Sequence, residues 1–124
     1  MQSMAGVVFV VALAAVTTAP ALAQNAPKAY LVVNLDIHDP ATFAKYRDAV
    51  PAVFQKYGGR FLVAGAEPKA LEGNLTLKRV AVIEFPSMEA AQQYRASSEY
   101  AAIEEFRTKA ARSDIVLLQG VAPR

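Results

Sequence analysis

The stretch that most constrains the fold of this chain is the run 29–37, AYLVVNLDI, because its apolar residues recur with a period of two. Every second residue from Leu31 to Ile37 is apolar, whereas the positions between them mix apolar and polar side chains. Successive side chains of a β-strand point to opposite faces, so the run predicts a strand with one fully apolar face and one mixed face. A sheet built on this strand needs a covering layer on its apolar side.

Start and stop signals divide the rest of the chain into two helical regions and three further strands. Asp39-Pro40 is a typical helix start, and Gly58-Gly59 is a typical helix end. Pro51 lies between them and predicts a kink or a new turn. The remaining predicted elements are a strand at 60–64, a loop at 65–78, a strand at 79–85, a helix capped by Ser87 and interrupted at Ser97-Ser98, a helical segment at 99–111, and a strand at 114–121.

The predicted order is βαββαβ, which places the chain in the α+β class. Right-handed crossovers then produce a ferredoxin-like domain, a four-stranded antiparallel sheet with both helices on one face. The other face is uncovered and half apolar, so it needs a partner. A second copy is the simplest one, and we expect a homodimer in which two sheets enclose a small barrel, the dimeric α/β barrel. The loop at 65–78 is longer than an ordinary hairpin connection, which makes it a candidate flap or partner contact.

The N-terminal segment has the features of a secretory signal peptide. It contains no Asp, Glu, Lys or Arg, and an apolar run at 7–16 precedes a small-residue cleavage site that ends at Ala23. An uncleaved membrane anchor is the alternative, but a bilayer needs about 20 apolar residues and this run is shorter. We therefore divide the chain into a cleaved signal peptide at 1–23, a tail at 24–28 and a single domain at 29–124. The expected protein is exported to the periplasm and has no membrane association after cleavage.

Composition argues against several classes of function. A formal net charge of +2 is too small to indicate binding to nucleic acid or to an anionic membrane. The absence of cysteine excludes disulfides, thiol catalysis and cysteine-ligated zinc. His38 is the single histidine, and although Asp36 and Asp39 are close in sequence, these side chains alternate in direction and predict no metal site. No cofactor is expected either, because a haem site would need a histidine on a helix that faces the open sheet.

Three short motifs follow one another along the chain: YGGRF at 57–61, EG at 72–73 and EFPS at 84–87. With the residues around them they cover nearly all of 29–121, and the chain resembles the family of the uncharacterised domain DUF1330, in the dimeric α/β-barrel superfamily. Leu75 and Tyr94-Arg95 depart from the family pattern, which often has a tryptophan and two adjacent aromatic residues there. The resemblance implies a ferredoxin-like fold and a dimer. It implies no particular reaction, because the superfamily includes cofactor-free monooxygenases, lactone isomerases and haem-dependent dismutases.

Arg60 and Glu84 form the first candidate site, at one end of the open face. An antiparallel hairpin with Ala64 opposite Val80 places these two charged residues opposite each other. The first strand is antiparallel to the third, which brings Tyr30 to the same end. Arg60 could then bind a carboxylate or an enolate, with Glu84 as the proton acceptor. A structural ion pair at the dimer interface is the alternative.

Tyr100 and Arg107 form the second candidate site. They are seven residues apart in the last predicted helix and therefore share roughly one face. One interpretation is that they close the pocket over the strand end. The alternative is that Arg107 pairs with Glu72 or Glu84 and ties the helix to the loop.

Two functions are consistent with these residues. The first is a small-molecule-binding homodimer whose anionic or aromatic ligand contacts Tyr30, Arg60, Glu84, Tyr100 and Arg107 in a pocket at the sheet face. The second is a cofactor-independent monooxygenase or isomerase with Glu84 as the base and Arg60 as the anion anchor. A cavity of a few hundred Å³ beside Glu84 would support the second function. Whether the protein is an enzyme stays open at this point.

Overall fold

The computed structural model describes residues 6, 8, 12 and 26–124. The predicted signal peptide and its cleavage site lie outside the described residues, apart from those three isolated positions. No helix in the described part of the chain is long and apolar enough to span a bilayer. The elements are β1 (Ala29–Ile37), α2 (Pro40–Gln55), β2 (Arg60–Ala66), β3 (Arg79–Phe85), α3 (Met88–Ala96), α4 (Ser98–Ala110) and β4 (Ala111–Gln119).

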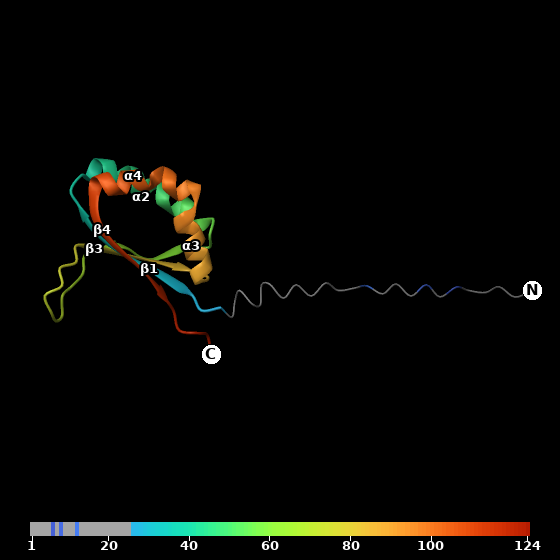
Figure 1. Ribbon diagram of the computed structural model, residues 1–124. Helices are drawn as coiled ribbons and strands as arrows, with labels where there is room; N and C mark the ends of the chain where they lie inside the picture. The colour runs from blue at the N-terminus through green and yellow to red at the C-terminus, as the bar shows by residue number, and fades with distance from the viewer. Residues whose placement is uncertain (1–5, 7, 9–11, 13–25) are drawn as a thin grey trace, which may run out of the picture.

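The four strands form one antiparallel sheet in the order β2-β3-β1-β4, and the three helices lie on one side of it (Figure 1). This arrangement confirms the predicted ferredoxin-like fold. Strand β1 is central and pairs with β3 on one side and with β4 on the other. Tyr30, for example, lies opposite Glu84 of β3 and opposite Leu118 of β4. The side without helices is called the open face below.

The core lies between the sheet and the helices. Leu31, Val33 and Leu35 of β1 are each less than a tenth exposed, as the alternation in this strand predicts. Burying such a side chain stabilises the fold by about 1.5–3 kcal/mol. The other core residues are Ala29, Phe43, Val50, Val53, Phe54, Ala81, Ile83, Phe85, Ala91, Tyr94, Tyr100, Ala110 and Ala111.

Side-chain caps set where the helices begin. Asp39 Oδ1 accepts a hydrogen bond from the Thr42 amide at 3.2 Å at the start of α2. Ser97 both ends α3 and caps α4, since its hydroxyl accepts from the Tyr100 amide at 3.1 Å. Its extended backbone, with ψ of 151°, breaks the helical region at the predicted position. Pro51 lies inside α2, which continues past it to Gln55.

The predicted start of the last strand is wrong, because β4 begins at Ala111 rather than at residue 114, and it ends at Gln119. The Ala110 carbonyl accepts hydrogen bonds from the backbone amides of His38 and Asp39 at 2.9 and 3.1 Å. Ala111 is already extended, with φ of −149° and ψ of 149°. The chain therefore passes from helix to strand without a loop, and the polar residues after Ala111 belong to the strand.

The predicted hairpin register holds at only one end of β2. Arg60 lies opposite Glu84 as predicted, but Ala64 pairs with Ala81 instead of Val80. Two register shifts separate the ends of the pairing, between residues 61 and 63 and between residues 64 and 66. Gly65 has a φ of +74°, a conformation that glycine adopts with little strain and that suits a bulge. The bulges also extend β2 to Ala66, two residues beyond its predicted end.

A row of four valines crosses the middle of the open face. Val63, Val82, Val32 and Val116 lie side by side on β2, β3, β1 and β4. The two outer members are 37% and 53% exposed, and we call this row the valine band. The open face is therefore apolar in its centre, with charged residues toward both ends.

We expect Leu35→Ala to lower the free energy of unfolding by about 2–5 kcal/mol, because it leaves a cavity between the sheet and the helices. Val121→Ala is the control, since Val121 is 90% exposed and its truncation should change the free energy by about 0.5 kcal/mol or less. Urea denaturation followed by circular dichroism measures both changes. Equal losses in the two variants would contradict the placement of Leu35 in the core.

Candidate functional site

The predicted pair at the end of the open face is an ion-paired cluster of three residues. Arg60 Nε donates to Glu84 Oε1 at 2.9 Å, and Lys28 Nζ donates to the same oxygen at 3.2 Å. The Glu84 side chain is 11% exposed, whereas both cations are more than half exposed. Tyr30 lies in the same cross-strand row, opposite Glu84. The structure therefore brings Tyr30, Arg60 and Glu84 together and adds Lys28 to them.

Lys28 could have been found by extending the first strand by one residue. The even-numbered positions of β1 face the open side, and Lys28 continues that series. Its carbonyl accepts a hydrogen bond from the Gly120 amide at 2.6 Å, so strand-like pairing continues to this residue.

The electrostatics of Glu84 favour its ionised form. Burial raises the pKa of this carboxyl group, but the hydrogen bonds and charges of Arg60 and Lys28 outweigh that effect and hold the pKa below its ordinary value. A carboxylate held in this way is a weak proton acceptor at neutral pH. The cluster is consequently well suited to stabilising a sheet end and poorly suited to abstracting a proton.

A second polar cluster lies on the opposite side of the sheet, in the helical layer. The Tyr100 hydroxyl accepts hydrogen bonds from the guanidinium groups of Arg95 and Arg107, the latter at 3.1 Å. Arg95 also lies over the Tyr100 ring, 4.5 Å from its centroid, and Arg107 lies 5.8 Å from the centroid of the Tyr46 ring. The contact between Tyr100 and Arg107 is consistent with their predicted common face. We call Tyr46, Tyr100, Arg95 and Arg107 the Arg–Tyr cluster.

The predicted ion pairs of Arg107 with Glu72 or with Glu84 are wrong. Its nearest ion-pair partner is Glu104, one turn earlier in α4, at 3.8 Å. Glu84 bonds to Lys28 and Arg60 on the other side of the sheet, and within the described residues Glu72 forms no ion pair with Arg107. The open-face candidates and the Tyr100–Arg107 pair are therefore two separate groups.

Arg107 carries a buried positive charge that is only partly compensated. It is 6% exposed, and its Nε has no hydrogen-bond partner. Burial lowers the pKa of the guanidinium, but the interaction with Tyr100, which includes a hydrogen bond, and then Glu104 outweigh this and raise it above its usual value. Burial, and then Tyr94 and Tyr100, raise the pKa of Tyr46 well above its usual 10.0. The tyrosine is therefore neutral, and it supplies no negative charge to Arg107.

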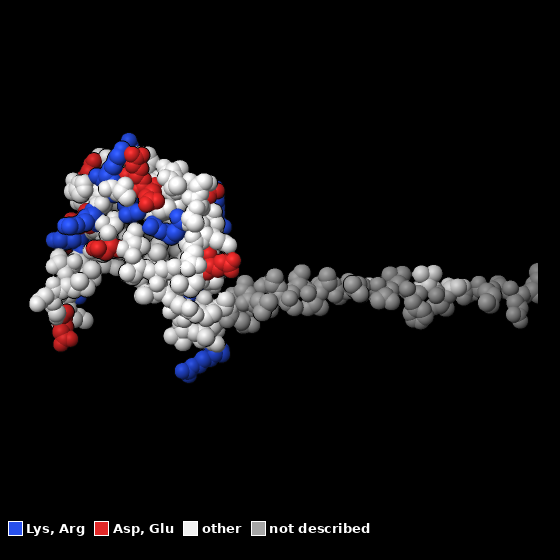
Figure 2. All heavy atoms as spheres, in the orientation of Figure 1, with Lys and Arg blue, Asp and Glu red and all other residues white. Residues whose placement is uncertain are grey.

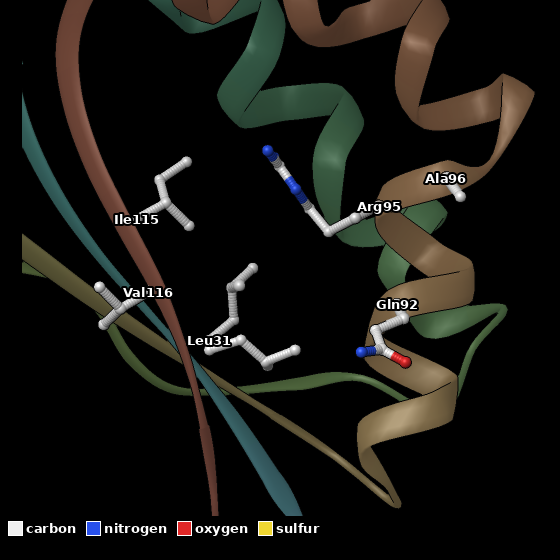
Figure 3. A pocket seen from close by; sticks show the side chains of 7 residues that line it. Leu31, Gln92, Arg95, Ala96, Ile115 and Val116 are labelled. Atoms are coloured by element: carbon white, nitrogen blue, oxygen red, sulfur yellow. The ribbon is translucent and has the colours of Figure 1, made fainter.

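A cavity of about 440 Å³ opens beside this cluster, between α3 and the helix-covered side of β1 and β4 (Figure 3). Arg95 and Gln92 of α3 reach into the space, and Ile115 and Leu31 face them from the sheet, whereas Val116 points away. We call this cavity the α3–sheet cleft. Its lining residues are Leu31, Gln92, Arg95, Ala96, Ile115, Val116 and Leu117.

A smaller cavity of about 380 Å³ lies at the other end of the open face, beneath the base of the β2–β3 loop. It is lined by Asn34, Asp36, Thr76, Lys78, Arg112 and Asp114. Neither this cavity nor the α3–sheet cleft is lined by Glu84. The larger apolar cavity therefore lies away from the site that the sequence indicated for a catalytic base.

The sequence did not point to Arg95 or Gln92 as site residues. Arg95 stands out only because it follows Tyr94 where the resembled family often has a second aromatic ring. Its role depends on the turn between α3 and α4, which brings Tyr100 back to within hydrogen-bond distance of it. Within the described residues, no group of three His, Cys, Asp or Glu residues could hold a metal ion.

Comparison with known proteins identifies a family and several structures of the same fold. Residues 28–121 match the family described as domain of unknown function (DUF1330), and no curated protein matches the chain. A protein of unknown function from Rhodopseudomonas palustris aligns with a TM-score of 0.63 at 18% identity, covering 86% of this chain and 95% of its own. SnoaB, a cofactor-independent oxygenase from Streptomyces nogalater, aligns with a TM-score of 0.56 at 17% identity, covering 80% and 96%. A dimeric protein of unknown function and ferredoxin-like fold from Bacteroides fragilis aligns with a TM-score of 0.51 at 12% identity, covering 74% and 95%.

We expect Glu84→Gln to lower the free energy of unfolding at pH 7, with a loss that shrinks as the pH falls below 4.5. The pKa of Glu84 is depressed in the folded protein, so its stabilising effect is fully present above the ordinary value of 4.5 and disappears as the carboxylate is protonated. Urea denaturation at about six pH values between about 3 and 8 covers the titration range of a carboxyl group. It measures the difference in free energy of unfolding between the variant and the wild type.

Glu67→Gln is the control for this measurement, because the Glu67–Arg79 pair is at least half exposed on both sides and contributes little. A loss for Glu84→Gln that is no larger than that for Glu67→Gln, or that is independent of pH, would contradict the stabilising role of the cluster.

Proposed function

The chain belongs to the DUF1330 family of domains of unknown function, and from this premise we propose that it is an exported, dimeric domain that binds a small organic anion. The ligand has an acidic group and an apolar or aromatic body, and it lies in the α3–sheet cleft. The observation that carries the proposal is Arg95, which reaches into an otherwise largely apolar cavity next to a second, buried guanidinium.

The charges around the cleft favour an acidic group on the ligand. Arg95 and Arg107 converge on the one hydroxyl oxygen of Tyr100, and in the described part of the chain no carboxylate lies within ion-pair distance of Arg95. Two neighbouring guanidinium groups repel each other unless an anion lies close by. A guanidinium group also binds a carboxylate through two parallel hydrogen bonds, which gives the ligand a defined orientation.

The walls of the cleft favour an apolar body on the ligand. Leu31, Ile115 and Leu117 form its sheet side, and the methyl group of Ala96 belongs to its helical side. A volume of about 440 Å³ falls within the range of about 300–1,000 Å³ that small-molecule sites occupy. Gln92 supplies an amide that can donate or accept a hydrogen bond, so it can select among ligands that carry a second polar group.

A cofactor-independent monooxygenase or isomerase, with Glu84 as the base and Arg60 as the anion anchor, is the second candidate function. Its support is the fold shared with SnoaB, a cofactor-independent oxygenase, and a shared fold does not determine a reaction. The two cations on Glu84 weaken it as a base, and neither cavity described above adjoins it. Ligand binding in the cleft is therefore the better supported function.

The open face supports the dimeric part of the proposal. The valine band is apolar across all four strands and has no cover within the described part of the chain. A second copy covers such a face with an identical one, and the two sheets then enclose a barrel. A structure of similar fold is described as dimeric, which is consistent with this assembly.

Export is supported by the apolar leader at the N-terminus, and an exported protein of this kind is expected in the periplasm.

We expect a screen of aromatic carboxylates by thermal shift to find ligands that stabilise the wild type, and Arg95→Ala to bind them at least about tenfold more weakly. Loss of a charged hydrogen-bonding partner corresponds to about 1.5–3 kcal/mol of binding free energy. Isothermal titration calorimetry measures the affinities. Primary amides of the same acids serve as uncharged ligands, and they should bind weakly to both proteins.

Arg47→Ala is the control variant, because Arg47 is 64% exposed on α2 and its removal changes the net charge equally. A ligand that binds Arg95→Ala as tightly as the wild type would place the binding site elsewhere. A ligand that loses affinity in Glu84→Gln and Arg60→Ala, and not in Arg95→Ala, would favour the second candidate function.

We expect the wild type to be a dimer at micromolar concentration and Val116→Asp to shift it toward the monomer, because this substitution buries a carboxylate against the partner's valine band. Ala101→Asp adds the same charge on exposed α4 and should leave the dimer intact. Sedimentation velocity measures the distribution of species. A monomeric wild type would contradict the proposed dimer.

A further inference from the structure

The loop between β2 and β3, residues 67–78, projects past the sheet on the side away from the helices (Figure 1). We call it the β2–β3 arm. Arg79 Nη2 lies 3.3 Å from the Glu67 carboxylate at its base, and the Lys78 amide donates to Asn34 Oδ1 at 3.0 Å. Because Asn34 belongs to the central strand, this second contact fixes the base of the arm to the strand next to β3.

The outer part of the arm exposes apolar side chains. Leu71 is 90% exposed and Leu75 is 79% exposed. In the described part of the chain, no hydrogen bond or ion pair joins residues 68–77 to the rest of the domain. In Figure 2 the arm is the lobe at the lower left, with an acidic patch near its tip, and its sequence carries two acids, Glu67 and Glu72, and two bases, Lys69 and Lys78. Exposed leucines on a projection without such contacts indicate a surface that packs against another molecule.

We propose that the β2–β3 arm is a clasp that packs Leu71 and Leu75 against a second copy of this chain. The inference rests on the face-to-face dimer proposed above. The arm and the valine band lie on the same side of the sheet, so a partner that covers the band also comes beside the arm. Because the arm extends past the open face, it reaches the flank of that partner, and two-fold symmetry gives each copy one arm on the other.

The charges beneath the arm favour a second copy over an unrelated protein. The smaller cavity is lined by two carboxylates, Asp36 and Asp114, and by two cations, Lys78 and Arg112. None of the four forms an ion pair with any residue in the described part of the chain. A surface with equal numbers of acids and bases is complementary to itself, because a two-fold axis can place an acid of one copy near a base of the other.

A site-directed cross-link tests the inference, and the absence of cysteine makes it simple. Leu71→Cys carries a photoactivatable benzophenone maleimide on the purified protein at a concentration where the wild type is dimeric. We expect irradiation to produce a covalent dimer. Ala101→Cys, on exposed α4, is the matched control and should remain a single chain after irradiation. Cross-links confined to one chain in the Leu71 variant would overturn the inference.

Sedimentation velocity supplies the second measurement. Leu71→Glu/Leu75→Glu should raise the dimer dissociation constant at least tenfold, whereas Ala101→Glu/Ala102→Glu adds the same charge on the helical layer and should leave the constant unchanged. Both pairs of positions are exposed, so neither variant is expected to disturb folding. A dimeric wild type whose dissociation constant is unaffected by the two glutamates in the arm would contradict the clasp alone. A monomeric wild type would overturn the proposed dimer and the clasp together.

Discussion

The pairing of β1 with a neighbour on each side determines which face of the sheet each candidate residue on a strand occupies. Because β1 is central, its alternation is transmitted in register to β3 and β4, and side chains in one cross-strand row share one face. The odd-numbered positions of β1 build the core and the sheet side of the cleft, and the even-numbered positions build the open face. A slip of one residue would exchange the two faces, so the apolar alternation stabilises the sheet and also separates the two polar clusters.

The two clusters have opposite electrostatic character because their burial differs. On the open face, one mostly buried carboxylate is matched by two exposed cations, and the cluster is internally compensated. In the helical layer, a buried guanidinium and one at the cleft meet at the hydroxyl group of Tyr100, and the nearest carboxylate is 3.8 Å from Arg107. An incompletely compensated charge next to a cavity is better satisfied by an anion than by water alone. The physical argument for ligand binding therefore applies to the second cluster.

Sequence patterns predicted the features that local rules control. The alternation of β1, the caps at Asp39 and Ser87, the interruption of the helical region at Ser97, and the Arg60–Glu84 pairing are recovered in the structure. The bulges in β2 were not predictable, because one adjoins a single glycine at positive φ, Gly65, and the other lies in a run of residues that is regular in sequence. The start of β4 was not predicted either, because its first residues are mostly polar and resemble a loop in sequence. In the structure, the Ala110 carbonyl accepts hydrogen bonds from the His38 and Asp39 amides, and the strand begins directly after it.

The site in the helical layer was beyond such rules because its members come from three helices, and only their packing brings them together. The cleft and the open face share one strand, β4, which is an edge strand paired only with β1. Ile115 and Leu117 line the cleft, whereas Val116 and Leu118, on the same strand, point to the open face. A second copy on the open face would restrain β4, and a ligand in the cleft would restrain it from the other side. Thermodynamic linkage requires these two effects to be reciprocal, so a ligand that binds the dimer more tightly must also strengthen the dimer by the same factor.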